Sequence, residues 1–171
     1  ALYDHREEVA EKFCVKFGAV AEISYESLLA REDLDAIDIC LPTFLHAEAT
    51  IKAANAGKHV VCEKPMALTV DEADAMAAAC RDAGVRLMIG HCIRFWPEYA
   101  HLKFLNDSGE LGQLLSLNLT RFGQFPTWSS ENWLADESKG KGGVLDMHIH
   151  DTDYALYLLG NPTKMESWGN V

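Results

Sequence analysis

The stretch His59-Val60-Val61-Cys62-Glu63-Lys64-Pro65 decides the fold class, because an apolar run is followed at once by a charged pair and a proline. The apolar run predicts a short buried strand. Pro65 fixes its own φ and keeps Lys64 extended, so the lysine is aimed from the carboxyl end of that strand. Open α/β sheets bind their ligands at that edge. A solvated surface lysine is the ordinary alternative.

Two further apolar runs, residues 35–41 (DAIDICL) and 85–90 (VRLMIG), are also preceded by helical patterns. The helix over residues 44–56 ends at Gly57, and the next begins at Thr69 with Glu72 at capping-box spacing. This alternation of helix and strand predicts an α/β fold with a parallel sheet covered by helices.

The pattern changes after Gly90, where a second domain is predicted to begin. It contains a helix over residues 97–106, an alternating run over 114–122, an aromatic loop and a helix around Asp146. Residues 165–171 are typical of a strand entering a sheet, and residues 1–4 of the tail of one. We therefore expect both ends of the chain to lie within a longer protein.

Composition excludes several classes of partner. The net charge of −11, with no basic segment, opposes binding to nucleic acid or to an anionic membrane. Five cysteines without CxxC spacing are typical of buried thiols in a reducing compartment. Without a signal-peptide pattern or an apolar run long enough to cross a bilayer, the sequence predicts a cytoplasmic protein.

A second motif lies in residues 142–153 (GGVLDMHIHDTD). At 100° per residue, Asp146, His150, Asp153 and Tyr157 share one helical stripe between two apolar ones, which predicts the half-buried wall of a cleft. Surface charges and a hydrogen-bonded core histidine are an equally weighted alternative. His148 and His150 are two residues apart and face different sides, so no metal site is predicted.

Two loops after predicted strands are further candidates. In residues 42–46 (PTFLH), backbone amides and the Thr43 hydroxyl can face a ligand, although Thr43 is equally a helix N-cap. After the third strand, Arg94 with its aromatic neighbours can hold a cofactor or substrate oxygen, or belong to an interdomain packing cluster.

Taken together, these motifs resemble the glucose-fructose oxidoreductase/inositol dehydrogenase (Gfo/Idh/MocA) family of NAD(P)-dependent oxidoreductases. The resemblance covers nearly the whole chain in the family's order. It runs through residues 38–43 with His46, residues 56–60, Glu63-Lys64-Pro65, Gly90 with Arg94-Phe95, residues 108–112 and residues 133–153.

The resemblance implies a partial dinucleotide-binding Rossmann domain over residues 1–91. The beginning of an α+β domain with an open antiparallel sheet, for substrate and oligomerisation, follows over residues 92–171. It implies hydride transfer between NAD or NADP and the carbinol or carbonyl of a sugar, polyol or related small molecule. It also implies a homo-oligomer, a dimer or tetramer.

Site residues follow from the same resemblance. Lys64, Asp146 and His150 are implied to be catalytic. His150 is the expected general base because its pKa is near neutral, Asp146 orients the reacting hydroxyl, and Lys64 stabilises developing negative charge. The implied substrate contacts are Asp153 and Trp133. The implied cofactor contacts are Asp4, Arg6, Pro42, Thr43, His46, Glu63 and Arg94.

Three features depart from the family pattern. The G-x-G-x-x-G turn that cradles the pyrophosphate is not among these residues. Asp4 can bind a ribose, but His5 and Arg6 can instead meet a 2′-phosphate, so NAD and NADP both remain open. The segment between Gly143 and Asp146 is one apolar residue short, which rotates the helix entrance by about 100°.

Two other functions stay open beside the oxidoreductase. One is a non-catalytic relative that binds a sugar-like ligand or a partner subunit, and the other is a metal-dependent hydrolase or lyase.

Overall fold

A computed structural model describes residues 1–124 and 126–169 of the chain. They form two compact units: unit 1 contains residues 1–41, 45–62 and 69–88, and unit 2 contains residues 42–44, 63–68 and 89–171, as far as these are described. The elements are α1 (Glu7–Phe17), α2 (Tyr25–Leu29), β1 (Ala36–Ile39), η1 (Thr43–Leu45), α3 (His46–Asn55), β2 (His59–Cys62), α4 (Val70–Asp82), β3 (Leu87–Ile89), η2 (Cys92–Phe95), α5 (Pro97–Ser108), η3 (Ser130–Ala135), α6 (Glu137–Gly140), α7 (Gly142–Asp146) and α8 (Ile149–Leu159).

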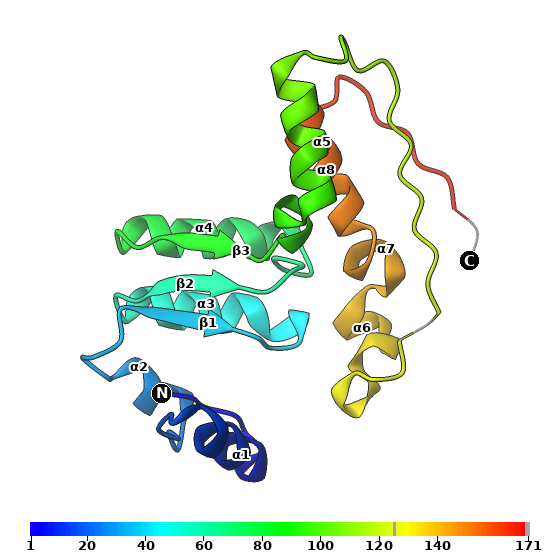
Figure 1. Cartoon of the computed structure of the whole chain (residues 1–171). Coiled ribbons are helices and arrows are strands. Elements are labelled where there is room, and N and C mark those ends of the chain that lie inside the picture. The colour runs from blue at the N-terminus through cyan, green and yellow to red at the C-terminus, as the bar shows by residue number, and fades with distance from the viewer. Residues whose placement is uncertain (125, 170–171) are drawn as a thin grey trace. The chain divides into compact units, whose positions relative to one another are not determined.

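The three predicted strands form one sheet in the order β1-β2-β3 (Figure 1). β1 and β2 are parallel, with Ala36 opposite His59 and Ile39 opposite Cys62. Side chains alternate between the two faces of a strand, so Ile39 and Cys62 are buried whereas their neighbours Asp38 and Val61 are exposed. The α/β fold with a parallel sheet is confirmed.

Helices α3 and α4 cover this sheet, as the alternating pattern predicts. α3 packs against β1, β2 and α4. The predicted capping box at the start of α4 is confirmed: the Glu72 N–H donates to Thr69 Oγ1 at 3.2 Å, and the Thr69 N–H donates to Glu72 Oε2 at 3.1 Å. These contacts fix where α4 begins.

The N-terminal residues form less of a strand than predicted. Leu2 makes an isolated parallel bridge with Ala21, and α1 follows from Glu7. A strand needs a partner along its whole length to satisfy its backbone groups, and among the described residues only this bridge supplies one.

Unit 2 is built around Tyr154 of α8, which is fully buried. Its hydroxyl donates to the Tyr99 carbonyl oxygen at 2.6 Å, and the two rings meet edge to face at 4.8 Å between centroids. Ile93 of η2 and Leu158 complete the buried cluster. α5 and α8 therefore lie side by side, as Figure 1 shows.

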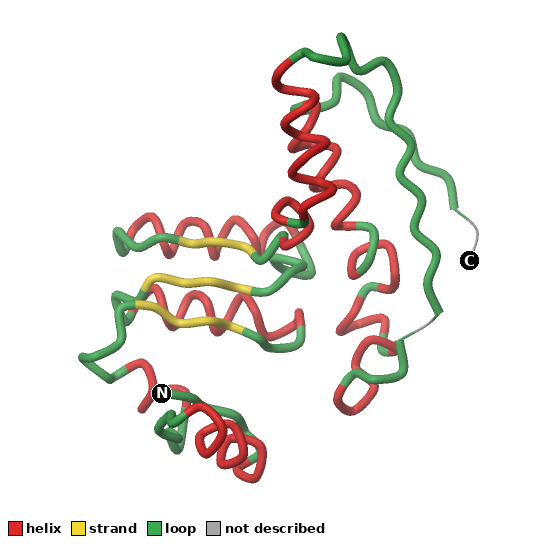
Figure 2. The backbone as a smooth tube through the Cα atoms, viewed as in Figure 1, coloured by secondary structure: helices red, strands yellow, loops and turns green. Residues whose placement is uncertain are grey.

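After β3, none of the described residues forms a strand (Figure 2). The sequence pattern predicts a strand-like segment at two places in this part of the chain. Residues 114–122 alternate as expected but lack a paired neighbour, and the expected strand over residues 165–171 is not formed by residues 165–169; residues 170 and 171 lie outside the described residues. The physical reason is that a lone segment has no ladder to complete.

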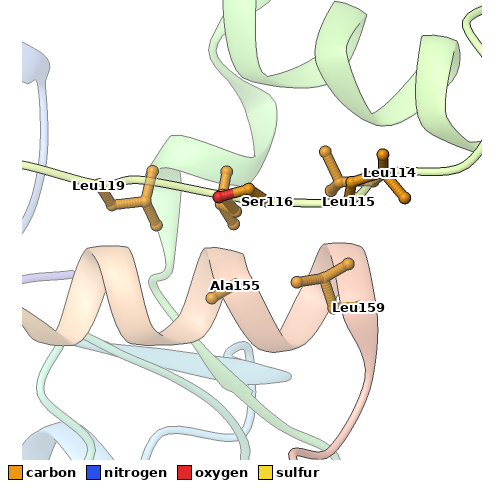
Figure 3. Close-up of a pocket in the computed structure, with 7 residues that line it drawn as sticks. Leu114, Leu115, Ser116, Leu119, Ala155 and Leu159 are labelled. Carbon is orange, nitrogen blue, oxygen red and sulfur yellow. The ribbon is translucent and has the colours of Figure 1, made fainter.

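The alternating run instead lies over α8 and leaves an apolar groove of about 250 Å³ (Figure 3). The groove is lined from the extended segment by Leu114, Leu115, Ser116, Leu117 and Leu119, and from α8 by Ala155 and Leu159. The groove holds no ionisable side chain, so it offers no group for acid–base chemistry.

The predicted single helix around Asp146 is two helices, which corrects the expected stripe. α7 ends at Asp146 and α8 begins at Ile149, so Asp146 is not in the same helix as His150. The N–H groups of Met147 and His148 both donate to the Gly143 carbonyl, at 3.0 and 3.2 Å. The second bond spans five residues rather than four, which widens the turn and separates the helices.

The cysteine prediction also needs correction. Cys62 and Cys80 are buried as expected, but Cys40 and Cys92 are exposed. Both exposed residues follow a strand, where the backbone has left the packed sheet. Among the described residues, no helix combines the length and apolar character that crossing a membrane requires.

Candidate active site

Lys64 and Asp146 form the first part of the candidate site in unit 2. The Lys64 ammonium donates to the carboxylate Oδ1 of Asp146 at 3.0 Å and to its carbonyl oxygen at 2.9 Å. Their side chains remain 21% and 17% exposed. The Lys64 N–H also donates to Glu63 Oε2 at 3.1 Å. Lys64, which follows β2, thus contacts the end of α7, and both side chains of the pair remain partly accessible to solvent.

His150 lies in the first turn of α8 and is half-buried. Burial lowers its pKa, and the positive charges of Lys64 and Arg121 and the neighbouring His91 lower it further, while Asp151 opposes them. Its Nδ1 is buried and finds no hydrogen-bond partner among the described residues. The lowered pKa favours a neutral ring, which can accept a proton.

Asp153 lies one helical turn further along α8 and is held by Arg94. Arg94 Nε donates to Oδ2 at 2.7 Å, and its Nη2 donates to Oδ1. This bidentate pair raises the pKa of Arg94, and the guanidinium also lies 4.7 Å from the centre of the Tyr157 ring. Asp153 is only 9% exposed. Arg94 therefore anchors η2 to α8.

His91 joins this group, although it is absent from the predicted site residues. Its Nε2 lies 3.7 Å from Asp153 Oδ1, and its side chain is 18% exposed. Burial lowers the pKa of His91; Asp153 opposes this, whereas Arg94 and Lys64 add to it. The available signal in sequence was its position just after the third strand, which parallels that of Lys64 after the second.

Asp151 is held in the same way by an arginine that sequence reasoning also missed. Arg121 Nε and Nη2 donate to its two carboxylate oxygens at 2.7 and 2.9 Å. These hydrogen bonds lower the pKa of Asp151, whose side chain is only 5% exposed. The pair ties the extended segment to the first turn of α8, next to His150.

Trp133 lies in η3 and packs edge to face on Phe44, with 6.3 Å between ring centroids. Glu131 and Asn132, just before it, have φ of 53° and 51°, which is an uncommon conformation for residues other than glycine. Beside Phe44, Thr43 is buried and Pro42 is half-buried. This aromatic pair thus places Trp133 in the same unit as Lys64, Asp146 and His150.

The remaining predicted residues, Asp4, Arg6 and His46, belong to unit 1. Arg6 Nε and Nη2 donate to the two carboxylate oxygens of Asp4, each at 3.2 Å, and this lowers the pKa of Asp4. His46 is fully buried, with Nε2 2.7 Å from the Leu41 carbonyl oxygen. Its side chain therefore holds the loop that leaves β1.

Unit 2 thus brings together a cation, a carboxylate and a neutral imidazole, which are Lys64, Asp146 and His150. The imidazole can take a proton from a hydroxyl, and the ammonium can stabilise an oxygen that becomes negative. Within residues 1–124 and 126–169, no three His, Cys, Asp or Glu side chains gather closely enough to hold a metal ion.

Comparison with known proteins identifies the family. Residues 1–91 match the family described as "Oxidoreductase family, NAD-binding Rossmann fold", and residues 99–170 match the "GFO/IDH/MocA C-terminal domain". The chain is 37% identical over 166 residues to the scyllo-inositol 2-dehydrogenase (NAD(+)) of Bacillus subtilis, covering 88% of the chain and 46% of that enzyme.

The chain is also similar to a hydratase and to a dehydrogenase of known structure. The chain is 35% identical over 139 residues to the 2,7-anhydro-N-acetylneuraminate hydratase of Mediterraneibacter gnavus, covering 81% of the chain and 37% of the relative. The structure of the WlbA dehydrogenase from Bordetella pertussis, in complex with NADH and UDP-GlcNAcA, aligns with a TM-score of 0.83 at 28% identity. It covers 92% of this chain and 46% of that one.

The chain spans less than half the length of the curated relatives that it matches. Within that span the similarity includes both the Rossmann-type part and the beginning of the C-terminal domain. The chain belongs to the Gfo/Idh/MocA family of oxidoreductases.

Proposed function

We propose that the protein containing this chain transfers hydride between NAD or NADP and a CH–OH carbon of a sugar, polyol or related small molecule. The observation that carries this proposal is the contact between Lys64 and Asp146, with the Lys64 charge near enough to lower the pKa of the half-buried His150 in the same unit. Residues 1–91 form the cofactor domain in this proposal, and residues 92–171 begin the substrate domain.

His150 acts as the general base. Oxidation of an alcohol requires a group that takes the hydroxyl proton, and a neutral imidazole suits this because its lowered pKa keeps it unprotonated. Its buried Nδ1 has no partner among the described residues, so we assign proton transfer to Nε2. The same nitrogen returns the proton when a carbonyl is reduced.

Lys64 and Asp146 position the reacting oxygen. The ammonium stabilises the negative charge that grows on this oxygen as its proton leaves. Asp146 uses Oδ1 to hold Lys64, and its second oxygen can accept a hydrogen bond from the substrate. The pair is partly exposed, which is what a ligand requires.

The residues present suit the cofactor at the nicotinamide side. The proposed contacts follow the ends of the three parallel strands and are Pro42, Thr43, Glu63 and Arg94. Folds of this kind bind dinucleotides at that edge of the sheet. Asp4 and Arg6 would meet the ribose or its phosphate, and His46 would shape the β1 loop. When bound, the nicotinamide accepts the hydride or returns it.

Asp153 and Trp133 would contact the substrate. Arg94 occupies one lone pair on each carboxylate oxygen of Asp153. A substrate hydroxyl can still donate a hydrogen bond to the second lone pair of either oxygen. Trp133 supplies an apolar face, which can pack on the C–H surface of a sugar ring.

The test is titration of the full-length gene product with NADH and with NADPH, followed by nicotinamide fluorescence. Asp4→Ala should weaken binding if the ribose is held by Asp4, whereas Arg6→Ala should weaken only NADPH if it meets a phosphate. Turnover is then measured with scyllo-inositol, levoglucosan and D-xylose, the compounds after which three similar dehydrogenases are named. Cofactor binding without oxidation of any polyol would favour the non-catalytic alternative, and binding of neither nucleotide would overturn the proposal.

A further inference from the structure

The contact between His91 and Asp153 has a spacing that suits a bound oxygen atom. His91 Nε2 and Asp153 Oδ1 are 3.7 Å apart, which is too far for a direct hydrogen bond. One oxygen that lies to the side of the line joining them can be about 2.8 Å from both atoms, which is ordinary hydrogen-bond length. The two side chains remain 18% and 9% exposed.

The charges around the gap determine which group donates. Arg94 holds Asp153 ionised with two hydrogen bonds, so the carboxylate can only accept. Burial, Arg94 and Lys64 keep His91 neutral against the pull of Asp153, with His150 as a further neighbour in the cluster. A neutral ring has one N–H, and the negative charge beside Nε2 favours the proton there.

We infer that His91 is a specificity-determining residue that, together with Asp153, binds a second, non-reacting hydroxyl of the substrate. That hydroxyl donates to Asp153 Oδ1 and accepts from His91 Nε2–H. The inference rests on the proposed function, because it assigns one hydroxyl to His150 for reaction and another to His91 for recognition. The substrate class narrows to compounds with at least two hydroxyl groups.

The first test needs no turnover. Nitrogen-15 NMR of the histidine rings in the full-length gene product, assigned with His91→Phe, should show neutral His91 with its proton on Nε2 at neutral pH. A proton on Nδ1 would overturn the inference, because one hydroxyl cannot donate to Asp153 and His91 at once. Adding scyllo-inositol, levoglucosan or D-xylose should shift the His91 signals.

The second test separates recognition from structure. For the polyol with the highest kcat/KM, His91→Phe should lower kcat/KM by about tenfold to a hundredfold, mainly through KM, as expected for loss of a hydrogen bond beside a charge. On the monodeoxy analogue that lacks the bound hydroxyl, wild type and variant should be alike. His91→Gln, which can place an N–H near the same point, should restore part of the loss.

A matched control is His101→Phe, which changes an exposed histidine that stacks on Phe104 of α5. Equal losses on the parent polyol and on every monodeoxy analogue would make His91 merely structural. If no sugar is oxidised but the His91 signals shift with one, the hydroxyl site stands and the proposed oxidation falls. If neither responds to any of the three sugars, both fall.

Discussion

Asp151 and Asp153 on α8 are each held through both carboxylate oxygens by an arginine, whereas Asp146 accepts from Lys64 through only one carboxylate oxygen and its backbone carbonyl. The first two side chains are 5% and 9% exposed, and Asp146 is 17% exposed. Arginine presents a rigid fork that matches a carboxylate, while lysine is a point charge on a flexible stem. The difference separates anchoring pairs, which hold elements together, from a pair that a ligand can rearrange.

The largest expected effect is on catalysis by the residues proposed to act with the Lys64–Asp146 pair. His150→Ala should lower kcat by about 10²–10⁴ because the proton acceptor is lost, with little change in cofactor affinity. Steady-state rates and NADH titration measure the two quantities. His148→Ala is the control, since this exposed histidine lies two residues away. Full activity in His150→Ala would remove His150 from the mechanism.

Lys64→Met should lower kcat by about 10²–10³, because the growing charge on the reacting oxygen loses its cation. Lys64→Arg keeps the charge and should recover part of the rate. Removing the lysine charge should also raise the pKa of His150, so the acidic limb of the pH–rate profile should move to higher pH. An unchanged limb would mean that Lys64 and His150 do not interact in the working enzyme.

The difference between the Arg121–Asp151 pair and the Lys64–Asp146 pair is tested by measuring the free energy of unfolding. Asp151→Asn should lower the free energy of unfolding by about 2–3 kcal/mol, since it leaves the Arg121 side chain, which is 26% exposed, without its buried charged partner. Asp146→Asn should cost less than about 1 kcal/mol, because that pair is more exposed and Lys64 keeps the Asp146 carbonyl. Urea unfolding measures both. Equal costs would show that the two kinds of pair do not differ.

The smallest expected effect is the pH dependence of stability. His91 and His150 have pKa values below the ordinary 6.5 in the fold, so the unfolded chain binds more protons as pH falls below that value. Their contribution is therefore complete above about pH 6.5 and lost as pH falls through the folded values. His150→Phe should flatten the slope of the unfolding free energy there; an unchanged slope would contradict the burial argument.

Local patterns predicted much of unit 1. The three apolar runs became the three strands, and Thr69 with Glu72 became the capping box, because both depend on residues close in sequence. The break between α7 and α8 was not predicted, since it depends on how the Gly143 carbonyl accepts two N–H groups. The contacts of His91 with Asp153 and of Arg121 with Asp151 were not predicted because the partners lie 62 and 30 residues away.

The sequence alone determined that a lysine would stand at the end of a parallel strand, because an apolar run followed by Glu-Lys-Pro dictates extended geometry at Lys64. Only the tertiary structure decided that Lys64 would meet Asp146, 82 residues further on, and that Arg94 would hold Asp153, 59 residues away. Backbone preferences act over a few residues, whereas hydrogen bonds between distant side chains exist only once the packed core has fixed their separation.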